Sequence, residues 1–220
     1  FYITNKDSSD TTFSIKLNSE ELKAPLPTPH KEIYIYDVNM EGVHLRFGSV
    51  ARGGLRWSNR LEDYRKEILG LAKTQQTKNV VIIPEGSKGG FIIKKQDEKN
   101  LVNESKKQYK KFIKSLLDIT DNFSVNNEKL FPKDVICYDK HDPYLVVAAD
   151  KGTATFSDIA NEISMKENFW LGDAFASGGS NGYNHKEVGI TAKGAWESVK
   201  LHFLEQEKNI SALSIYWTFL

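Results

Sequence analysis

The stretch NVVIIPEGSKGGFIIKK, residues 79–95, contains the features that decide the fold of this chain. Two short apolar runs, NVVIIP and GFIIKK, have the length and β-branched composition of strands. A glycine-rich segment separates them, and we expect it to form a turn that carries Lys88. Glycines let a ligand approach the main chain closely, so Lys88 is a candidate for a functional site. A solvent-exposed lysine on a connecting turn is the alternative.

Strand-like segments occur on both sides of this stretch. Residues 32–38 (EIYIYDV) and 43–50 (VHLRFGSV) predict two strands that can pair as an antiparallel hairpin, because the NMEG between them is turn-like. Farther along, PYLVVAAD at residues 143–150 predicts a buried strand that ends in an acid.

Helical patterns alternate with these strands. Apolar residues recur at helical spacing and leave charged residues on the opposite side. The order of elements therefore predicts an α/β fold, in which a single three-layer domain has a mixed β-sheet flanked by helices. The predicted helices cover residues 60–78, 100–120, 155–164 and 190–209.

The composition excludes several classes of protein. The 220 residues are 40% hydrophobic, enough for a substantial core, and the net charge of +1 implies neither a nucleic acid nor an anionic membrane as partner. No apolar run approaches the roughly 20 residues that a membrane-spanning helix needs. The single cysteine, Cys137, excludes an intramolecular disulfide and fits a reducing, cytoplasmic setting. The N-terminus lacks the pattern of a signal peptide.

Cations beside glycines form a second candidate site. In ARGGLRWSNR, residues 51–60, Arg52 precedes a glycine pair and Arg56 follows it. A guanidinium offers parallel N–H donors that suit bidentate capture of a carboxylate or phosphate. A turn with surface arginines is the alternative that the local sequence leaves open.

Lys78 and Asp150 complete the set of charged candidates. Lys78 lies three residues after Gln75 at the end of a predicted helix, so the two share a helix face. A cation near a helix C-terminus is also stabilising on dipole grounds, which gives Lys78 a structural alternative. Asp150 ends an apolar strand, where α/β proteins commonly place their sites, and capping of the following turn is its alternative.

Two other kinds of site are not expected. The five histidines include no HxxxH or similar pair, so we expect no metal site. The glycines of SGGSNG follow no clear strand and lack the GxGxxG spacing, so no dinucleotide fingerprint is present.

Three long segments resemble the catalytic segment of the large bacterial NAD-specific glutamate dehydrogenases. They are RGGLRWSNRLEDYRKEILGLAKTQQTKNVVIIPEGSKGGF, YLVVAADKGTATFSDIANEIS and FWLGDAFASGGSNGYNHKEVGITAKGAWESVKLHF. The resemblance runs from about residue 32 to about residue 203, most of the chain. It implies the fold of the substrate-binding domain of amino-acid dehydrogenases and the oxidative deamination of L-glutamate to 2-oxoglutarate and ammonia, with NAD as the cofactor.

The resemblance also implies a role for each charged candidate. Lys88 resembles the catalytic lysine near the α-carbon, which assists water in interconverting iminium and carbinolamine. Asp150 resembles the acid/base that exchanges a proton with the substrate amine. Lys78, with Gln75 beside it, resembles the pair that binds the α-carboxylate. Arg52 falls where the smaller enzymes use a lysine for the side-chain carboxylate, and a guanidinium fork still suits that group.

Smaller residues take supporting roles in the same comparison. The glycine pair after Arg52 would let the substrate lie against the backbone, and two hydroxyl residues match the segment that leads toward the nicotinamide. Glutamate has two carboxylates, so a site that binds it needs at least two fixed cations. These cations would also favour the neutral amine that Lys88 needs as a base. The supporting residues are Gly53, Gly54, Ser180 and Thr191.

The resemblance predicts three regions with different relations to the family. Residues 1–30 match it weakly, residues 31–209 form the substrate-binding and catalytic domain, and residues 210–220 are a tail unlike the family. We therefore expect a fragment that lacks the NAD-binding domain and is inert alone, because hydride transfer needs both partners at contact distance. A separate chain that carries the dinucleotide domain is a possible partner, and a homo-oligomer is expected.

Two other functions are considered. The chain could be a non-catalytic remnant, a dicarboxylate-binding or oligomerisation module without turnover. A dehydrogenase for leucine or phenylalanine is disfavoured, because Arg52 suits an acidic side chain where those enzymes need an apolar pocket.

Overall fold

The structure is a computed structural model that describes residues 12–19, 21, 26–78, 85–95, 100–182 and 185–208. The chain divides into two compact units, one ending at Asn181 and the other beginning at Gly182. This division falls inside the domain predicted over residues 31–209. In its described part, the second unit consists of two helices, α4 (His185–Val188) and α5 (Ile190–Glu205).

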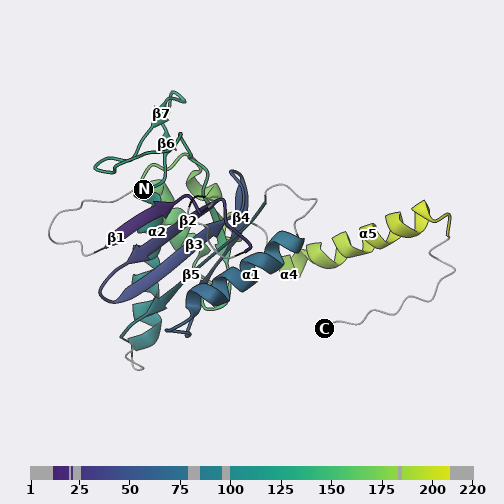
Figure 1. The fold of residues 1–220 in the computed structure, drawn as a ribbon. Coiled ribbons are helices and arrows are strands. Elements are labelled where there is room, and N and C mark those ends of the chain that lie inside the picture. Colours follow the sequence, from purple (N-terminus) through teal and green to yellow (C-terminus); the bar gives the residue numbers. More distant parts are fainter. Residues whose placement is uncertain are drawn as a thin grey trace. The chain divides into compact units, whose positions relative to one another are not determined.

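A seven-stranded mixed sheet forms the centre of the first unit (Figure 1), in the order β1-β2-β3-β5-β4-β8-β9. In this order, the neighbours β1, β2, β3 and β5 pair antiparallel. The neighbours β5, β4, β8 and β9 pair parallel. The strand β5 therefore lies where the two halves of the sheet meet. The strands are β1 (Phe13–Leu17), β2 (Lys31–Tyr36), β3 (Met40–Arg46), β4 (Ala51–Trp57), β5 (Glu85–Ile93), β8 (Val146–Ala149) and β9 (Ala176–Ser177).

Helices cover both faces of this sheet. On one face, α1 (Tyr64–Lys78) packs apolar side chains against Val43 and Leu45 of β3. On the other face, α2 (Leu101–Leu117) and α3 (Ser157–Lys166) bury theirs against Leu55 of β4 and strands β2, β5 and β8. The remaining elements are a small hairpin of β6 (Asn122–Phe123) and β7 (Lys129–Leu130), and the 3-10 helix η2 (Gly172–Ala174).

The α/β class and the mixed sheet flanked by helices are confirmed. The antiparallel pairing expected for residues 32–38 and 43–50 is confirmed in β2 and β3, although β3 ends at Arg46. The structure also contains the strand β4 over Ala51–Trp57, a stretch for which the sequence offered a turn as the alternative. Among the described residues, no helix is long and apolar enough to cross a membrane.

The turn expected around Lys88 is wrong, because residues 85–93 form one continuous strand. The glycines of this strand leave room for its neighbours rather than for a bend. A methyl group on Gly90 would lie 2.3 Å from Cδ1 of Ile68 on α1, and one on Gly89 would lie 2.4 Å from Cδ2 of Leu55 on β4. The strand expected over residues 79–84 lies outside the described residues.

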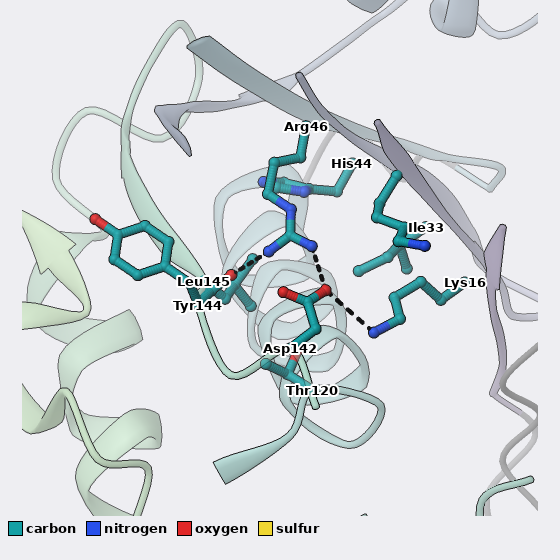
Figure 2. Close-up of a pocket in the computed structure, with 9 residues that line it drawn as sticks. Lys16, Ile33, His44, Arg46, Thr120, Asp142, Tyr144 and Leu145 are labelled. Atoms are coloured by element: carbon teal, nitrogen blue, oxygen red, sulfur yellow. Dashed lines mark hydrogen bonds and ion pairs between the residues drawn. The ribbon is translucent and has the colours of Figure 1, made fainter. Parts of the chain in front are cut away.

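A buried ionic cluster ties the segment before β8 to the sheet, on the face opposite α1 (Figure 2). The Arg46 guanidinium and the Lys16 ammonium both contact Oδ2 of Asp142, and Arg46 also donates to the carbonyl of Tyr144 at 2.5 Å. The amide of Asp142 donates in turn to Asp121 at 2.6 Å. These contacts fix the approach of the chain to β8 and therefore to Asp150.

His44 lies beside this cluster and is 2% exposed. Burial, and secondarily the positive charge of Arg46, lower the pKa of His44 to about 3. The Nε2 atom of His44 has no hydrogen-bond partner among the described residues. The folded chain therefore holds His44 as a neutral imidazole at neutral pH.

We expect substitution of Gly90 by alanine to lower the free energy of unfolding by about 1–3 kcal/mol, because the new methyl group would overpack the contact with Ile68. Gly70, in the interior of α1, is the matched control, since nothing lies within 4 Å of a methyl group there. Gly70→Ala should stabilise the chain by roughly 0.5–1 kcal/mol through helix propensity. Urea unfolding measures both changes, and equal effects of the two substitutions would contradict the packing argument.

We expect His44 to make the folded chain sensitive to acid. Because the pKa of His44 lies below the unfolded value of 6.5, the unfolded chain binds the extra proton first as the pH falls from 6.5 toward about 3. Stability should therefore fall over this window, by at most about 1.4 kcal/mol per pH unit from this residue. In His44→Leu, urea unfolding at several pH values should give a shallower decline, whereas substitution of exposed His202 should leave the slope unchanged. An unchanged slope in His44→Leu would contradict this assignment.

Candidate active site

Three adjacent parallel strands, β5, β4 and β8, position Lys88, Gly54 and Asp150. Successive side chains of a strand point to opposite faces of the sheet, so Arg52, Gly54 and Arg56 of β4 share one face. Arg56 is in register with Gly90, and Ile68 of α1 occupies the space where a side chain of Gly90 would lie. The candidate site therefore lies on the α1 face, on the other side of the sheet from the ionic cluster of Figure 2.

Lys88 and Asp150 form an ion pair at the centre of this face. The Lys88 Nζ atom lies 2.5 Å from Oδ2 of Asp150, and the two side chains are 10% and 19% exposed. Lys88 comes from the interior of β5, and Asp150 directly follows β8. Gly54 lies between them, since a methyl group there would be 3.0 Å from Cβ of Asp150 and 3.4 Å from Nζ of Lys88. The absence of a side chain at Gly54 thus allows the pair to form.

Arg56 is a second cation on Asp150. Its Nε atom donates to Oδ2 of Asp150 at 3.1 Å, and its Nη1 atom donates to Oε1 of Glu67 at 2.9 Å. The other Glu67 oxygen accepts a hydrogen bond from the hydroxyl of Ser58 at 2.5 Å. A series of ion pairs therefore runs from Lys88 through Asp150 and Arg56 to Glu67 on α1.

The pKa values of the two carboxyl groups follow from this series of ion pairs. Burial raises the pKa of Asp150, but hydrogen bonds from Lys88 and Arg56 outweigh burial and hold this pKa below its ordinary value. Burial likewise raises the pKa of Glu67, and the hydrogen bonds from Ser58 and Arg56 outweigh it, so this pKa is also lowered. Both groups are carboxylates at neutral pH.

The turn after β8 is fixed by Thr153. The backbone amide of Asp150 donates to the Thr153 hydroxyl at 3.1 Å, and that hydroxyl donates to the carbonyl of Leu55 at 2.6 Å. These hydrogen bonds join the end of β8 to the middle of β4. The position of Asp150 is therefore set by the sheet rather than by a free loop.

The residues proposed for the substrate carboxylates lie toward one end of the same face. Arg52 is exposed and makes no ion pair with another described residue, and it is in register with Gly86 of β5. Gln75 of α1 covers Gly86, since a methyl group there would be 2.9 Å from Cγ of Gln75. Lys78 is the last residue of α1, one turn beyond Gln75, and its side chain lies outside the described residues.

Gly53 and the two hydroxyl candidates have other surroundings. A methyl group on Gly53 would overlap the carbonyl oxygen of Ser87, so Gly53 permits the close approach of β4 to β5. Ser180 follows β9 and donates from both its amide and its hydroxyl to Oδ1 of Asp158, at 2.7 and 3.0 Å. Thr191 belongs to α5 in the second unit, and its side chain lies outside the described residues.

Sequence reasoning assigned no role to Glu67 or Ser58 and took Arg56 for a ligand-binding cation. Arg56 and Glu67 are 11 positions apart on a strand and a helix, so no spacing rule relates them. The run of charge at RLEDYRKE indicated a helix surface, and nothing in it distinguishes Glu67 from the acids around it.

The described part of the glycine-rich segment after β9 does not fit the pyrophosphate of a dinucleotide. The glycine-rich segment after β9 would have to point free amides at a pyrophosphate, but the amide of Ser180 is bound to Asp158. A carboxylate in that place would repel a phosphate. Among the described residues, no group of three or more His, Cys, Asp or Glu side chains is placed to hold a metal ion either.

Comparison with known families agrees with the resemblance noted above. A family model described as "Bacterial NAD-glutamate dehydrogenase, catalytic domain" matches residues 1–216. The NAD-specific glutamate dehydrogenase of Halomonas elongata is 58% identical over 195 residues, which cover 86% of this chain and 12% of that protein. The corresponding proteins of Pseudomonas aeruginosa and Mycobacterium tuberculosis are 55% and 52% identical, over 92% and 93% of this chain. The chain spans 13% of the length of each of these two relatives.

Among solved structures, the Leu-bound form of hetero-hexameric glutamate dehydrogenase from Thermus thermophilus is similar to 77% of this chain and 33% of its own. The TM-score is 0.45 and the sequence identity is 16%. The assignment of the fold rests on the sheet order and helix placement described above.

We expect removal of the Lys88 charge to raise the pKa of Asp150. The Lys88 hydrogen bond stabilises the carboxylate, so Lys88→Met should raise this pKa. Carbon-detected NMR of chain labelled with 13C at aspartate carboxyl groups measures the titration. Lys95→Met, at an exposed position just after β5, is the control and should leave Asp150 unaffected. A pKa of Asp150 that is equal in the wild type and in Lys88→Met would rule out the pair in solution.

Proposed function

Because the chain belongs to the family of bacterial NAD-glutamate dehydrogenases, we propose that it forms the part of such an enzyme that binds L-glutamate and carries the proton transfers of its deamination. The observation that carries this proposal is the ion pair of Lys88 and Asp150 on the α1 face of the sheet. A base and an acid in direct contact, one from β5 and the other from the residue that follows β8, can handle two protons of one reaction.

The substrate clamp is proposed at the end of this face where Arg52 lies. Glutamate has two carboxylates, and a site for it needs a cation for each. We assign the side-chain carboxylate to Arg52, whose exposed guanidinium has no ionic partner among the described residues. The α-carboxylate is assigned to Lys78 with Gln75, and Gly53 and Gly54 are proposed to form the backbone surface beneath the substrate. Ser180 and Thr191 are proposed to belong to the segment that leads toward the nicotinamide.

The proton transfers follow from the positions of Lys88 and Asp150. The Lys88 amine is proposed to take a proton from the water that adds to the iminium carbon, which forms the carbinolamine. Asp150, having received a proton from the substrate amine, is proposed to return it to the nitrogen as the carbon–nitrogen bond breaks. Asp150 then takes up the proton of the carbinolamine hydroxyl as the carbonyl forms, which releases ammonia and 2-oxoglutarate. The direct contact of Lys88 with Asp150 favours the carboxylate form of Asp150, so we propose that the substrate separates the two groups before they act.

The oxidation itself is not assigned to any residue of this chain. Its relatives are NAD-specific, and the described part of the glycine-rich segment after β9 does not fit the pyrophosphate of the dinucleotide. We propose that NAD is bound outside the described residues, by another region of a longer protein or by a separate chain. A homo-oligomer and a cytoplasmic location are also proposed, as expected from the sequence.

Isothermal titration of L-glutamate and of 2-oxoglutarate into the purified chain tests the clamp. We expect binding that Arg52→Ala weakens by about 10-fold or more, because the substrate loses a charged hydrogen-bond partner. Arg60→Ala is the matched control, since Arg60 is an exposed arginine just after β4 that pairs with Asp63. Glutarate, which has both carboxylates and no amine, should bind in the same Arg52-dependent way.

Equal affinities in Arg52→Ala and Arg60→Ala would argue against the proposed clamp. A binding module is favoured over a catalytic domain by a different result. In that result the wild-type chain and Asp150→Asn both bind L-glutamate and glutarate with equal affinity.

A further inference from the structure

We propose that Glu67 is a positioning residue, which together with Ser58 holds the Arg56 guanidinium on Asp150. The proposal rests on the proposed function, in that Asp150 is taken as the proton-transfer group. It adds two residues, Glu67 and Ser58, that never touch the substrate and act on the reaction through Arg56.

The contacts of Arg56 divide between two carboxylates. Its Nε atom donates to Asp150 and its Nη1 atom donates to Glu67, at 3.1 and 2.9 Å. Both oxygens of Glu67 are in use, one by Arg56 and the other by the hydroxyl of Ser58 at 2.5 Å. Ser58 is 2% exposed, and its oxygen also accepts a hydrogen bond from the amide of Arg60. Glu67 is therefore fixed at both oxygens while it holds Arg56.

Arg56 needs such an anchor because its side chain is long and not fully buried. The side chain is 18% exposed, and an arginine side chain released from its partners regains rotamer entropy. Glu67 comes from α1, which packs on the same face of the sheet through Ile68. The docking of α1 thus orients the cation that faces Asp150.

The charge of Glu67 and its geometry have opposite effects on Asp150. The groups around the Asp150 carboxylate are Lys88 of β5, Arg56 of β4, the backbone amide of Lys151 and, behind Arg56, Glu67 of α1. As a nearby negative charge, Glu67 by itself makes Asp150 easier to protonate. As the anchor of Arg56, it makes Asp150 harder to protonate. Removal of Glu67 therefore moves the pKa of Asp150 up if positioning dominates and down if through-space charge dominates.

The test is the NMR titration of Asp150 in chain labelled with 13C at aspartate carboxyl groups, without substrate. We expect Glu67→Ala to raise the pKa of Asp150 by about 0.5 or more, because Arg56 is released toward solvent. Glu67→Gln keeps an amide oxygen and an amide nitrogen that can hydrogen-bond with Arg56 and Ser58. It should therefore raise this pKa by less than Glu67→Ala does. Ser58→Ala, which removes one support of Glu67, should also raise it slightly and serves if Glu67→Ala does not fold.

Two controls separate positioning from a general effect of charge. Glu62→Ala removes an exposed acid just before α1 and should leave the pKa of Asp150 unchanged. In an Arg56→Met background, Glu67→Ala should no longer raise the pKa, because there is no guanidinium left to position. A fall or no change in the pKa of Asp150 in Glu67→Ala would overturn the proposal, as would a rise that persists in the Arg56→Met background.

This outcome is distinguishable from failure of the proposed function. The titration needs neither glutamate nor NAD, so a rise in Glu67→Ala supports positioning even if the chain binds no dicarboxylate. Conversely, Arg52-dependent binding of glutamate together with an unshifted Asp150 would keep the function and overturn the role of Glu67.

Discussion

The close contact between β5 and its neighbours is the constraint on which the rest of the structure depends. Three positions of β5, Gly86, Gly89 and Gly90, have no side chain, and atoms of α1 and β4 occupy the space. This packing puts Lys88 on a rigid central strand, in the same layer as the end of β8. Gly54 then leaves the gap through which Lys88 reaches Asp150. A site built on strands in this way keeps its geometry better than one built on loops.

The two charged groups on the two faces of the sheet have different tasks. In the cluster of Arg46, Lys16 and Asp142 both cations are buried against one carboxylate, and this cluster holds the chain that enters β8. The group around Asp150 is more exposed, and under the proposed function a substrate carboxylate competes with Asp150 for its cations. The first arrangement suits structure and the second suits chemistry, because only the second can exchange its partners at modest cost.

The sequence predicted the class of the fold and the pairing of β2 with β3 from alternation and turn residues, and these follow from local rules. It predicted only the last residues of β5, within GFIIKK, because the glycines before them indicate a turn in sequence and the contacts that make them necessary come from α1 and β4. Local sequence made Lys88 and Asp150 candidates and the resemblance implied their roles, but only the structure brings them into contact. The link from Arg56 to Glu67 joins a strand to a helix, and such a pairing becomes visible only once the packing is known.

The filled spaces opposite the β5 glycines also constrain how this chain can diverge. A side chain at position 90 fits only if the residue at position 68 becomes shorter at the same time. Either change alone leaves an overpacked contact or a cavity, so a route between two well-packed sequences passes through a less stable intermediate. Substitutions at these two positions are thus expected to covary among related sequences, although one position lies on a helix and the other on a strand.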